Sequence, residues 1–190
     1  KAAQAYQLMG SVDEGLALIE KYPLESFNEA VTLLHRNFLL LLKDEQKAQA
    51  LTQLLHQNLP NHPQYILEYA ELLKKSEDYP AIEQLYTQLL DLEIAQNHRK
   101  DAYLQRAIVR KNMDKLQAAL EDYDALIKIQ SSAFYLLERS DIKLSLKDKK
   151  GALIDLNAAV QLQPDFETLL KRGHLYLKAK VYDRAIKDFT

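Results

Sequence analysis

Apolar residues recur at helical spacing along most of the chain, and short polar or charged stretches interrupt them at regular distances. In one clear case the apolar positions run from Phe134 to Leu146, stop at the charged stretch 147–150, and resume from Ala152 to Leu162. Pro164 follows, and a proline cannot continue a helix. The pattern therefore predicts two antiparallel helices joined by a short turn.

This helix pair recurs with a period of 33 residues between positions 100 and 190. Several columns of like residues agree at that spacing: Arg106, Arg139 and Arg172; Ala107, Ser140 and Gly173; Leu104, Leu137 and Leu170; Ala119, Ala152 and Ala185; Asp122, Asp155 and Asp188; Tyr123, Leu156 and Phe189. Agreement of independent columns at one spacing indicates a protein built of repeated supersecondary units. Small residues let the two helices approach closely, and bulky ones fill the space between hairpins.

Related hairpins are expected upstream, with a weaker match. Residues 63–98 show the same pattern, although the join around Glu93 to Lys100 is longer and suggests an extended second helix or an irregular link. Residues 25–62 place Arg36 where the other units have a small residue. We therefore expect one solenoid over residues 1–190, divided into a degenerate helix pair, a degenerate repeat, three full repeats and a truncated one: 1–24, 25–62, 63–98, 99–131, 132–164 and 165–190.

These columns resemble the tetratricopeptide repeat, in the subtype R-[G/A/S]…A-x-x-D-[FYL]. Arg139-Ser140 and Arg172-Gly173 carry the first part of the motif, and Ala152 with Asp155-Leu156 carries the second. The resemblance is strong over residues 100–190 and weaker before them. It implies an all-α fold, a right-handed α-α superhelix of about five to six antiparallel helix hairpins, and a bacterial origin.

Composition agrees with an all-α chain and narrows the possible partners. Only four Gly and five Pro interrupt 190 residues that are 47% hydrophobic, so the vocabulary is that of helices around a substantial core. A formal net charge of −2 supplies no field to attract nucleic acid. The longest apolar run, Phe38 to Leu42, is far shorter than the roughly 20 residues that span a bilayer. We expect neither nucleic acid binding nor membrane insertion.

The sequence leaves the cellular compartment open. Without cysteine there is no disulfide to indicate an oxidising environment, so cytoplasm and periplasm both stay possible. The chain starts at Lys1 and ends at Thr190 within a helical pattern, so we expect a piece of a longer protein, in which an upstream signal or lipid anchor would not be visible.

No motif for catalysis, cofactor or metal binding is present in the sequence. The histidines at 35, 56, 62, 98 and 174 form no recognised zinc spacing, and the scattered glycines form no phosphate loop. Acidic pairs such as Glu121-Asp122 are typical of solvated helix faces. The prediction is a protein that is not an enzyme and has no cofactor and no metal.

The Arg and Asp columns predict a ladder of ion pairs within the hairpins. The spacing puts one Arg on each first helix and one Asp on each second helix: Arg106 with Asp122, Arg139 with Asp155, and Arg172 with Asp188. An alternative pairs each Asp with the Arg of the following unit. In either arrangement the expected role is structural, since it holds helices in register.

The resemblance further implies a binding surface, because first helices line a concave groove in the family. Carried over by register, the predicted groove residues are Leu67, Glu71, Lys74, Leu104, Ile108, Lys111, Leu137, Asp141, Leu170 and His174. The leucines are expected as a partly exposed apolar stripe, although they could equally contact neighbouring first helices. The occupant would be another protein or peptide that lays an apolar or amphipathic segment along the groove.

Two further functions stay open at this stage. One is self-association through the C-terminal end, where Ala185, Ile186 and Phe189 close the chain with an apolar face. The other is an interaction module of a larger protein whose activity lies elsewhere. The function expected first is a scaffold or adaptor that binds a protein or peptide.

Overall fold

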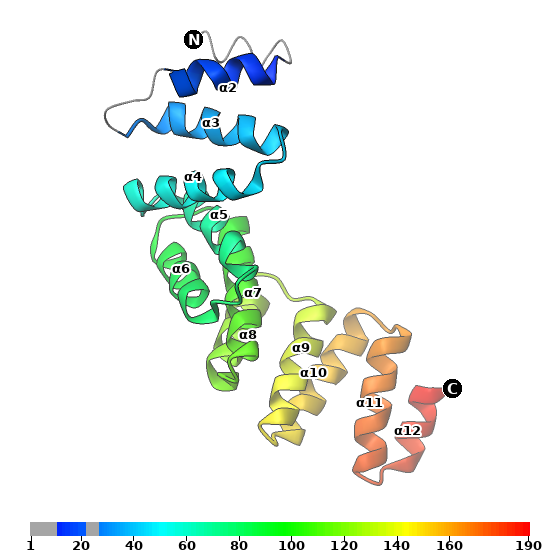
Figure 1. The fold of residues 1–190 in the computed structure, drawn as a ribbon. Coiled ribbons are helices and arrows are strands. Elements are labelled where there is room, and N and C mark those ends of the chain that lie inside the picture. The colour runs from blue at the N-terminus through cyan, green and yellow to red at the C-terminus, as the bar shows by residue number, and fades with distance from the viewer. Residues whose placement is uncertain (1–10, 22–26) are drawn as a thin grey trace. The chain divides into compact units, whose positions relative to one another are not determined.

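A computed structural model describes residues 11–21 and 27–190, and these residues form α-helices and turns without any strand (Figure 1). The helices of the described ranges are α2 (Val12–Lys21), α3 (Glu29–Leu41), α4 (Glu45–Asn58), α5 (Pro63–Lys74), α6 (Tyr79–Asp91), α7 (Gln96–Asn112), α8 (Leu116–Ile129), α9 (Ala133–Ser145), α10 (Lys149–Leu162), α11 (Phe166–Lys178) and α12 (Tyr182–Phe189). The first helix and the turn predicted within residues 1–24 lie outside the described residues.

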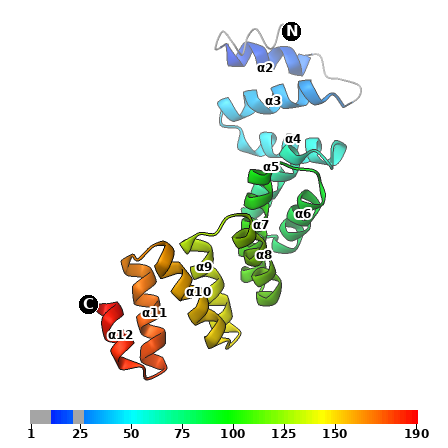
Figure 2. The same cartoon turned by 180° about the vertical axis from the view of Figure 1, so that it is seen from behind.

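The chain divides into two compact units, residues 1–92 and residues 93–190, which we call unit 1 and unit 2. Within unit 1, α2 packs on α3 and each helix from α3 to α6 packs on the next one; within unit 2 the same holds from α7 to α12 (Figures 1 and 2). The described residues thus contain hairpins α3/α4, α5/α6, α7/α8, α9/α10 and α11/α12. The single continuous solenoid stays a prediction.

One predicted boundary differs from the structure. The helix before the join around Glu93 to Lys100 is not extended, because α6 ends at Asp91; residues 92–95 form a non-helical link, and α7 starts at Gln96. Helix α7 has 17 residues, whereas α5 has 12 and α9 has 13. The four extra residues, 96–99, contain no Gly or Pro to end a helix, and they extend the first helix of the next hairpin.

Every hairpin turns at a residue with a left-handed backbone. These turn residues are Lys43, Glu77, Asp114, Lys147 and Lys180, with φ between 55° and 64°. In α9/α10 the Lys147 N–H donates to the Leu144 carbonyl at 3.0 Å, and the next N–H, of Asp148, donates to the Lys143 carbonyl at 2.8 Å. These two bonds satisfy the open end of the first helix. The turn residues therefore give a common register for comparing all hairpins.

In unit 2, small residues occupy the positions where the two helices of a hairpin meet. A Cβ added to Gly173 would lie 2.4 Å from Cε1 of Phe189, which is closer than any real contact. On the second helices, Ala119 and Ala152 are fully buried and Ala185 is 2% exposed. The bulky column fills the core beside them, with Tyr123 and Leu156 fully buried. The columns of the sequence are thus the packing contacts of the hairpins.

Candidate protein-binding surfaces

Of the predicted groove leucines of unit 2, Leu104 and Leu170 are half-buried, as expected for partly exposed side chains, and Leu137 lies in the core. Leu104 is half-buried against the cluster that contains Tyr123. Leu137 is only 7% exposed and belongs to a core cluster with Leu156 and Leu175. The expectation of a partly exposed side chain is therefore wrong at Leu137, because α10 and α11 cover it.

Accessible groove positions in unit 2 lie one helical turn farther along. Ile108 is 38% exposed on α7, and His174 is exposed on α11. Half-buried Leu170 and His174 line a cavity of about 550 Å³ together with Phe166 and Phe189. The His174 ring meets the Phe189 ring edge-on at 5.5 Å between centroids. This end of the unit therefore has a hollow with mainly apolar and aromatic walls.

Charged groove residues in unit 2 connect neighbouring first helices. Lys111 on α7 donates to Glu138 on α9. Lys171 on α11 donates to Asp141 on α9 at 2.8 Å and pairs with Glu167 at 3.5 Å. Two of the predicted contact residues, Lys111 and Asp141, are thus engaged within the chain. A partner would meet them as formed ion pairs rather than as open charges.

Each Arg of unit 2 pairs with the Asp of its own hairpin, as the column spacing predicts. Arg106 Nη2 lies 2.6 Å from Asp122 Oδ1, Arg139 Nη2 lies 2.5 Å from Asp155 Oδ1, and Arg172 Nη2 lies 2.6 Å from Asp188 Oδ1. The Asp side chains of the first two pairs are only 1% exposed. The alternative, in which each Asp serves the Arg of the next hairpin, does not occur.

The arginines also reach back to the preceding hairpin. Arg139 donates to Asp124 at 2.7 Å, and Arg172 donates to Asn157 at 3.1 Å. Each of these two guanidinium groups therefore joins three consecutive helices. The hydrogen bond to Asp155 raises the pKa of Arg139, and the bond to Asp124 raises it further. These effects outweigh burial, which lowers this pKa, so the guanidinium group is always charged. The sequence offered a signal for these contacts, since positions 124 and 157 share the 33-residue spacing.

Unit 1 has different residues at the ladder positions. Counted from the turn residues, His35 and Leu51 replace the Arg and Asp in α3/α4, and Tyr69 and Leu85 replace them in α5/α6. The His35 Nε2 atom is buried and makes no hydrogen bond to any described residue. Burial, partly offset by Glu20, lowers the pKa of His35. Unit 1 is thus held by apolar contacts where unit 2 uses ion pairs.

A second histidine of unit 1 is similarly placed. His56 on α4 stacks on Tyr69 of α5 with 4.8 Å between the ring centroids. Its Nδ1 atom is buried, and it makes no hydrogen bond within the described residues. Burial lowers the pKa of His56 as well. Both histidines therefore favour the neutral form in the folded chain.

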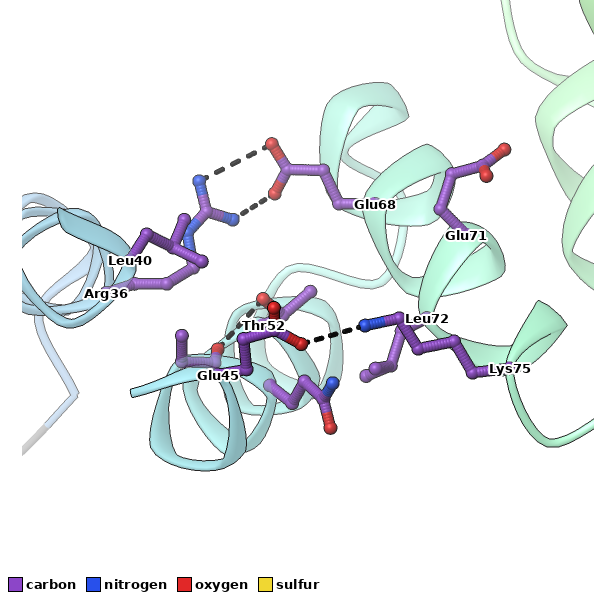
Figure 3. Close-up of a pocket in the computed structure, with 10 residues that line it drawn as sticks. Arg36, Leu40, Glu45, Thr52, Glu68, Glu71, Leu72 and Lys75 are labelled. Atoms are coloured by element: carbon purple, nitrogen blue, oxygen red, sulfur yellow. Dashed lines mark hydrogen bonds and ion pairs between the residues drawn. The ribbon is translucent and has the colours of Figure 1, made fainter. Parts of the chain in front are cut away.

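Unit 1 also contains an open cavity of about 430 Å³ between α3, α4 and α5 (Figure 3). Its walls combine apolar side chains with two ion pairs. The lining residues include Arg36, Leu40, Glu45, Ala48, Thr52, Glu68, Leu72 and Lys75. The Arg36–Glu68 pair spans one side of the space and the Lys75–Glu45 pair, at 3.1 Å, spans another (Figure 3). Sequence reasoning marked Arg36 as unusual but did not identify this cavity.

One of the three predicted groove residues of unit 1, Glu71, lines this cavity, whereas Leu67 and Lys74 do not. Glu71 contributes to its lining, is exposed, and accepts from Lys74 at 2.6 Å and from the Tyr86 hydroxyl at 3.4 Å. Burial raises the pKa of the Tyr86 hydroxyl, and the negative charge of Glu71 raises it further. This hydroxyl therefore stays protonated and able to donate. Leu67 is half-buried on α5. Glu71 is thus the predicted groove residue that connects the expected binding surface of unit 1 with this cavity.

The described residues contain no candidate for a metal site or for a membrane-spanning helix. No group of three or more His, Asp or Glu side chains there is placed to hold a metal ion. In that same part of the chain, no helix combines the length and apolar character needed to cross a bilayer.

Comparison with known proteins identifies the fold. No protein-family model matches the sequence, and no curated protein matches it. Among solved structures, MamA matches with a TM-score of 0.68 and 15% identity over 81% of this chain and 90% of that one. YrrB, described as a TPR protein with an unusual peptide-binding site, matches with a TM-score of 0.67 and 11% identity over 90% and 87%. The pilF product of Pseudomonas aeruginosa matches with a TM-score of 0.63 and 13% identity over 98% and 85%. At these identities the likeness establishes the fold, so the predicted all-α solenoid of helix hairpins is confirmed.

Proposed function

Because the chain has the tetratricopeptide-repeat fold, we propose that it is a scaffold or adaptor that binds a segment of another protein along its first helices and catalyses no reaction. The observation that carries this proposal is the set of accessible apolar side chains on first helices. Leu40 on α3 is 51% exposed and Ile108 on α7 is 38% exposed, although each lies on an amphipathic helix with a buried face. Such positions suit an apolar or amphipathic peptide.

Charge supports a protein partner rather than a polyanion. The formal net charge is −2, and the described lysines of the groove in unit 2 already pair with Glu138 and Asp141. YrrB shares the fold and is described by its peptide-binding site. The proposed ligand is therefore a peptide segment whose apolar side chains supply most of the contact area.

Affinity capture with two matched variants tests this proposal. Ile108→Glu places a charge on a first helix, and Ile154→Glu places the same charge on second helix α10, where Ile154 is 67% exposed. We expect a protein that the parent chain and Ile154→Glu retain and that Ile108→Glu loses, with helical circular dichroism unchanged. If both variants retain the protein equally, the first helices of unit 2 are not its binding surface.

Self-association is a second candidate, favoured by one observation. Phe189 is 45% exposed, whereas Tyr123 and Leu156, at the same position of the two earlier hairpins of unit 2, are fully buried. Ile186 on the same helix is 59% exposed. Light scattering of the parent chain and Ile186→Glu separates the candidates, because a dimer that the variant abolishes would assign this face to a second copy.

A further inference from the structure

The cavity of unit 1 arises from an exchange of residue sizes within one hairpin. Seven residues before the turn residue, four hairpins have a small side chain: Ala70, Ala107, Ser140 and Gly173. Nine residues after it, the same hairpins have a bulky one: Tyr86, Tyr123, Leu156 and Phe189. Hairpin α3/α4 reverses both choices, with Arg36 at the first position and Thr52 at the second. The second helix therefore lacks the bulky side chain that fills this space elsewhere.

Hairpin α7/α8 of unit 2 shows one side chain that occupies this space. Tyr123 on α8 is fully buried among residues of α7 and α9. Its hydroxyl donates to Glu138 on α9 at 3.3 Å, and Lys111 donates to the same Glu138 oxygen. An aromatic ring with a donor at its tip thus fills the wedge between two hairpins, and a carboxylate that also pairs with a cation accepts from that tip.

Unit 1 has a carboxylate at the equivalent place without the tyrosine, and this carboxylate, Glu68, also accepts from Gln64 at 2.8 Å. Glu68 has the position of Glu138, nine residues before the next turn residue, and it pairs with Arg36 as Glu138 pairs with Lys111. The Thr52 hydroxyl turns back to the Ala48 carbonyl at 3.0 Å and fills little of the cavity. Arg36 has a side chain only 9% exposed, and its Nε atom makes no hydrogen bond to a described residue.

The charges of the cavity select among possible occupants. Glu68 pairs with Arg36 and Glu45 pairs with Lys75, so these two pairs offer no unmatched charge to bind a carboxylate or a cation. Leu40, Ala48 and Leu72 supply apolar contact for a ring. A neutral side chain with an apolar body and a donor at its tip satisfies all of these walls.

We propose that the cavity between α3, α4 and α5 is a pocket for a tyrosine side chain of the partner segment, whose hydroxyl donates to Glu68 as Tyr123 donates to Glu138. This proposal rests on the proposed function and specifies one side chain of the ligand. The ring would contact Leu40, Ala48 and Leu72, and the hydroxyl would complete the polar set that Arg36 and Glu68 begin.

Titration of the full chain with p-cresol, the isolated tyrosine side chain, tests the pocket directly. Amide chemical shifts from two-dimensional NMR should move for residues that line the cavity, and p-cresol should bind about tenfold tighter than toluene because its hydroxyl reaches a charged acceptor. Thr52→Tyr should fill the cavity from within and abolish the shifts. Thr52→Leu, which fills it only partly, should weaken binding and serves if the larger substitution impairs folding.

Gln57→Tyr is the matched control, since Gln57 is exposed on α4 outside the cavity, and it should bind p-cresol like the parent chain. The inference is overturned if p-cresol moves no cavity amide, if toluene binds as tightly, or if the Thr52 variants bind like the parent. Each of these results would leave the capture experiment with Ile108→Glu intact, so the pocket and the proposed function fail separately.

Discussion

Unit 1 and unit 2 build the same hairpin from different interactions. At the positions where unit 2 pairs Arg139 with buried Asp155, unit 1 has His35 and Leu51. The turns are the same in both, with left-handed Lys43 and Lys147. The comparison shows that the left-handed turn and the apolar wedge define this hairpin, whereas the ion-pair ladder is an addition that fixes register in unit 2. It also shows that a departure from the pattern, at Arg36 and Thr52, leaves a cavity.

Breaking the ladder should give the largest effect. Arg139→Leu or Asp155→Leu alone leaves a buried charge with an incomplete set of partners and should lower the free energy of unfolding of unit 2 by about 3 kcal/mol. The double variant should cost less than the sum of the single ones, because Arg139 and Asp155 are then both absent and only Lys143 and the more exposed Asp124 lose a partner. Hydrogen exchange measured on peptides of α9 and α10 checks this; additive losses would contradict a direct pair.

The ladder shows which parts of the structure the sequence could predict. In residues 100–190 a strict 33-residue period produced one column of arginines and one of aspartates, so the pairing of Arg139 with Asp155 followed from register alone. The contact of Arg139 with Asp124 was missed because its column changes from Asp to Asn157, which hides a shared role behind different residue types. In unit 1 no such column exists, and nothing in the local pattern marked its ladder positions.

Exposure was harder to predict than pairing. Whether Leu137 faces a groove or the core depends on how closely α11 packs, and that distance is set by residues a full repeat away. The cavity depends on two changes, Arg36 and Thr52, that lie on different helices. Only Arg36 was unusual in the sequence. Thr52 is an ordinary helix residue, and its small size matters only because its counterpart Tyr123 fills the space between two hairpins.

Changing the size of the side chain at one core position should give the next largest effect on stability. Five residues after the turn residue, hairpin α5/α6 of unit 1 has Ile82 where hairpin α9/α10 of unit 2 has Ala152, and both are fully buried. Ile82→Ala should create a cavity and cost about 3 kcal/mol. Ala152→Ile should overpack and cost about 2 kcal/mol. Chemical denaturation monitored by exchange in each unit measures both, and a neutral result for either would show that the helices adjust their separation.

Acid should weaken unit 1 through its histidines. Burial lowers the pKa of His35 and of His56, so below about pH 6.5, the ordinary value, the unfolded chain binds more protons at these groups than the folded chain does. Their contribution to stability is complete above this pH and is lost as the pH falls below it. Exchange protection of α3 and α4, corrected for the intrinsic rate, should therefore decrease between pH 7.5 and 5.5.

Two variants make the pH effect specific. His35→Leu and His56→Leu should each reduce the slope of protection against pH in unit 1, and the double variant should remove most of it. Replacement of the exposed His62, which stacks on Tyr65 at 4.3 Å, should reduce the slope of protection against pH less than the His35 and His56 double variant does. An unchanged slope in the double variant would assign the acid sensitivity to other groups.

The smallest effect should be the one that the two units share. Lys43 and Lys147 both hold a left-handed backbone, with φ of 60° and 64°, that costs a residue with a Cβ about 1–2 kcal/mol. Glycine removes this strain but loses more backbone entropy on folding, so Lys43→Gly and Lys147→Gly should each stabilise by about 0.5 kcal/mol. Lys150→Gly, inside α10, should destabilise by a similar amount because that position is helical. Thermal unfolding of each full-length variant measures these changes. Equal gains at Lys43 and Lys147 would show that the turn contributes to stability independently of the ion-pair ladder. A gain at Lys147 alone would mean that the ion pairs of unit 2 hold its helices in the geometry that strains the turn.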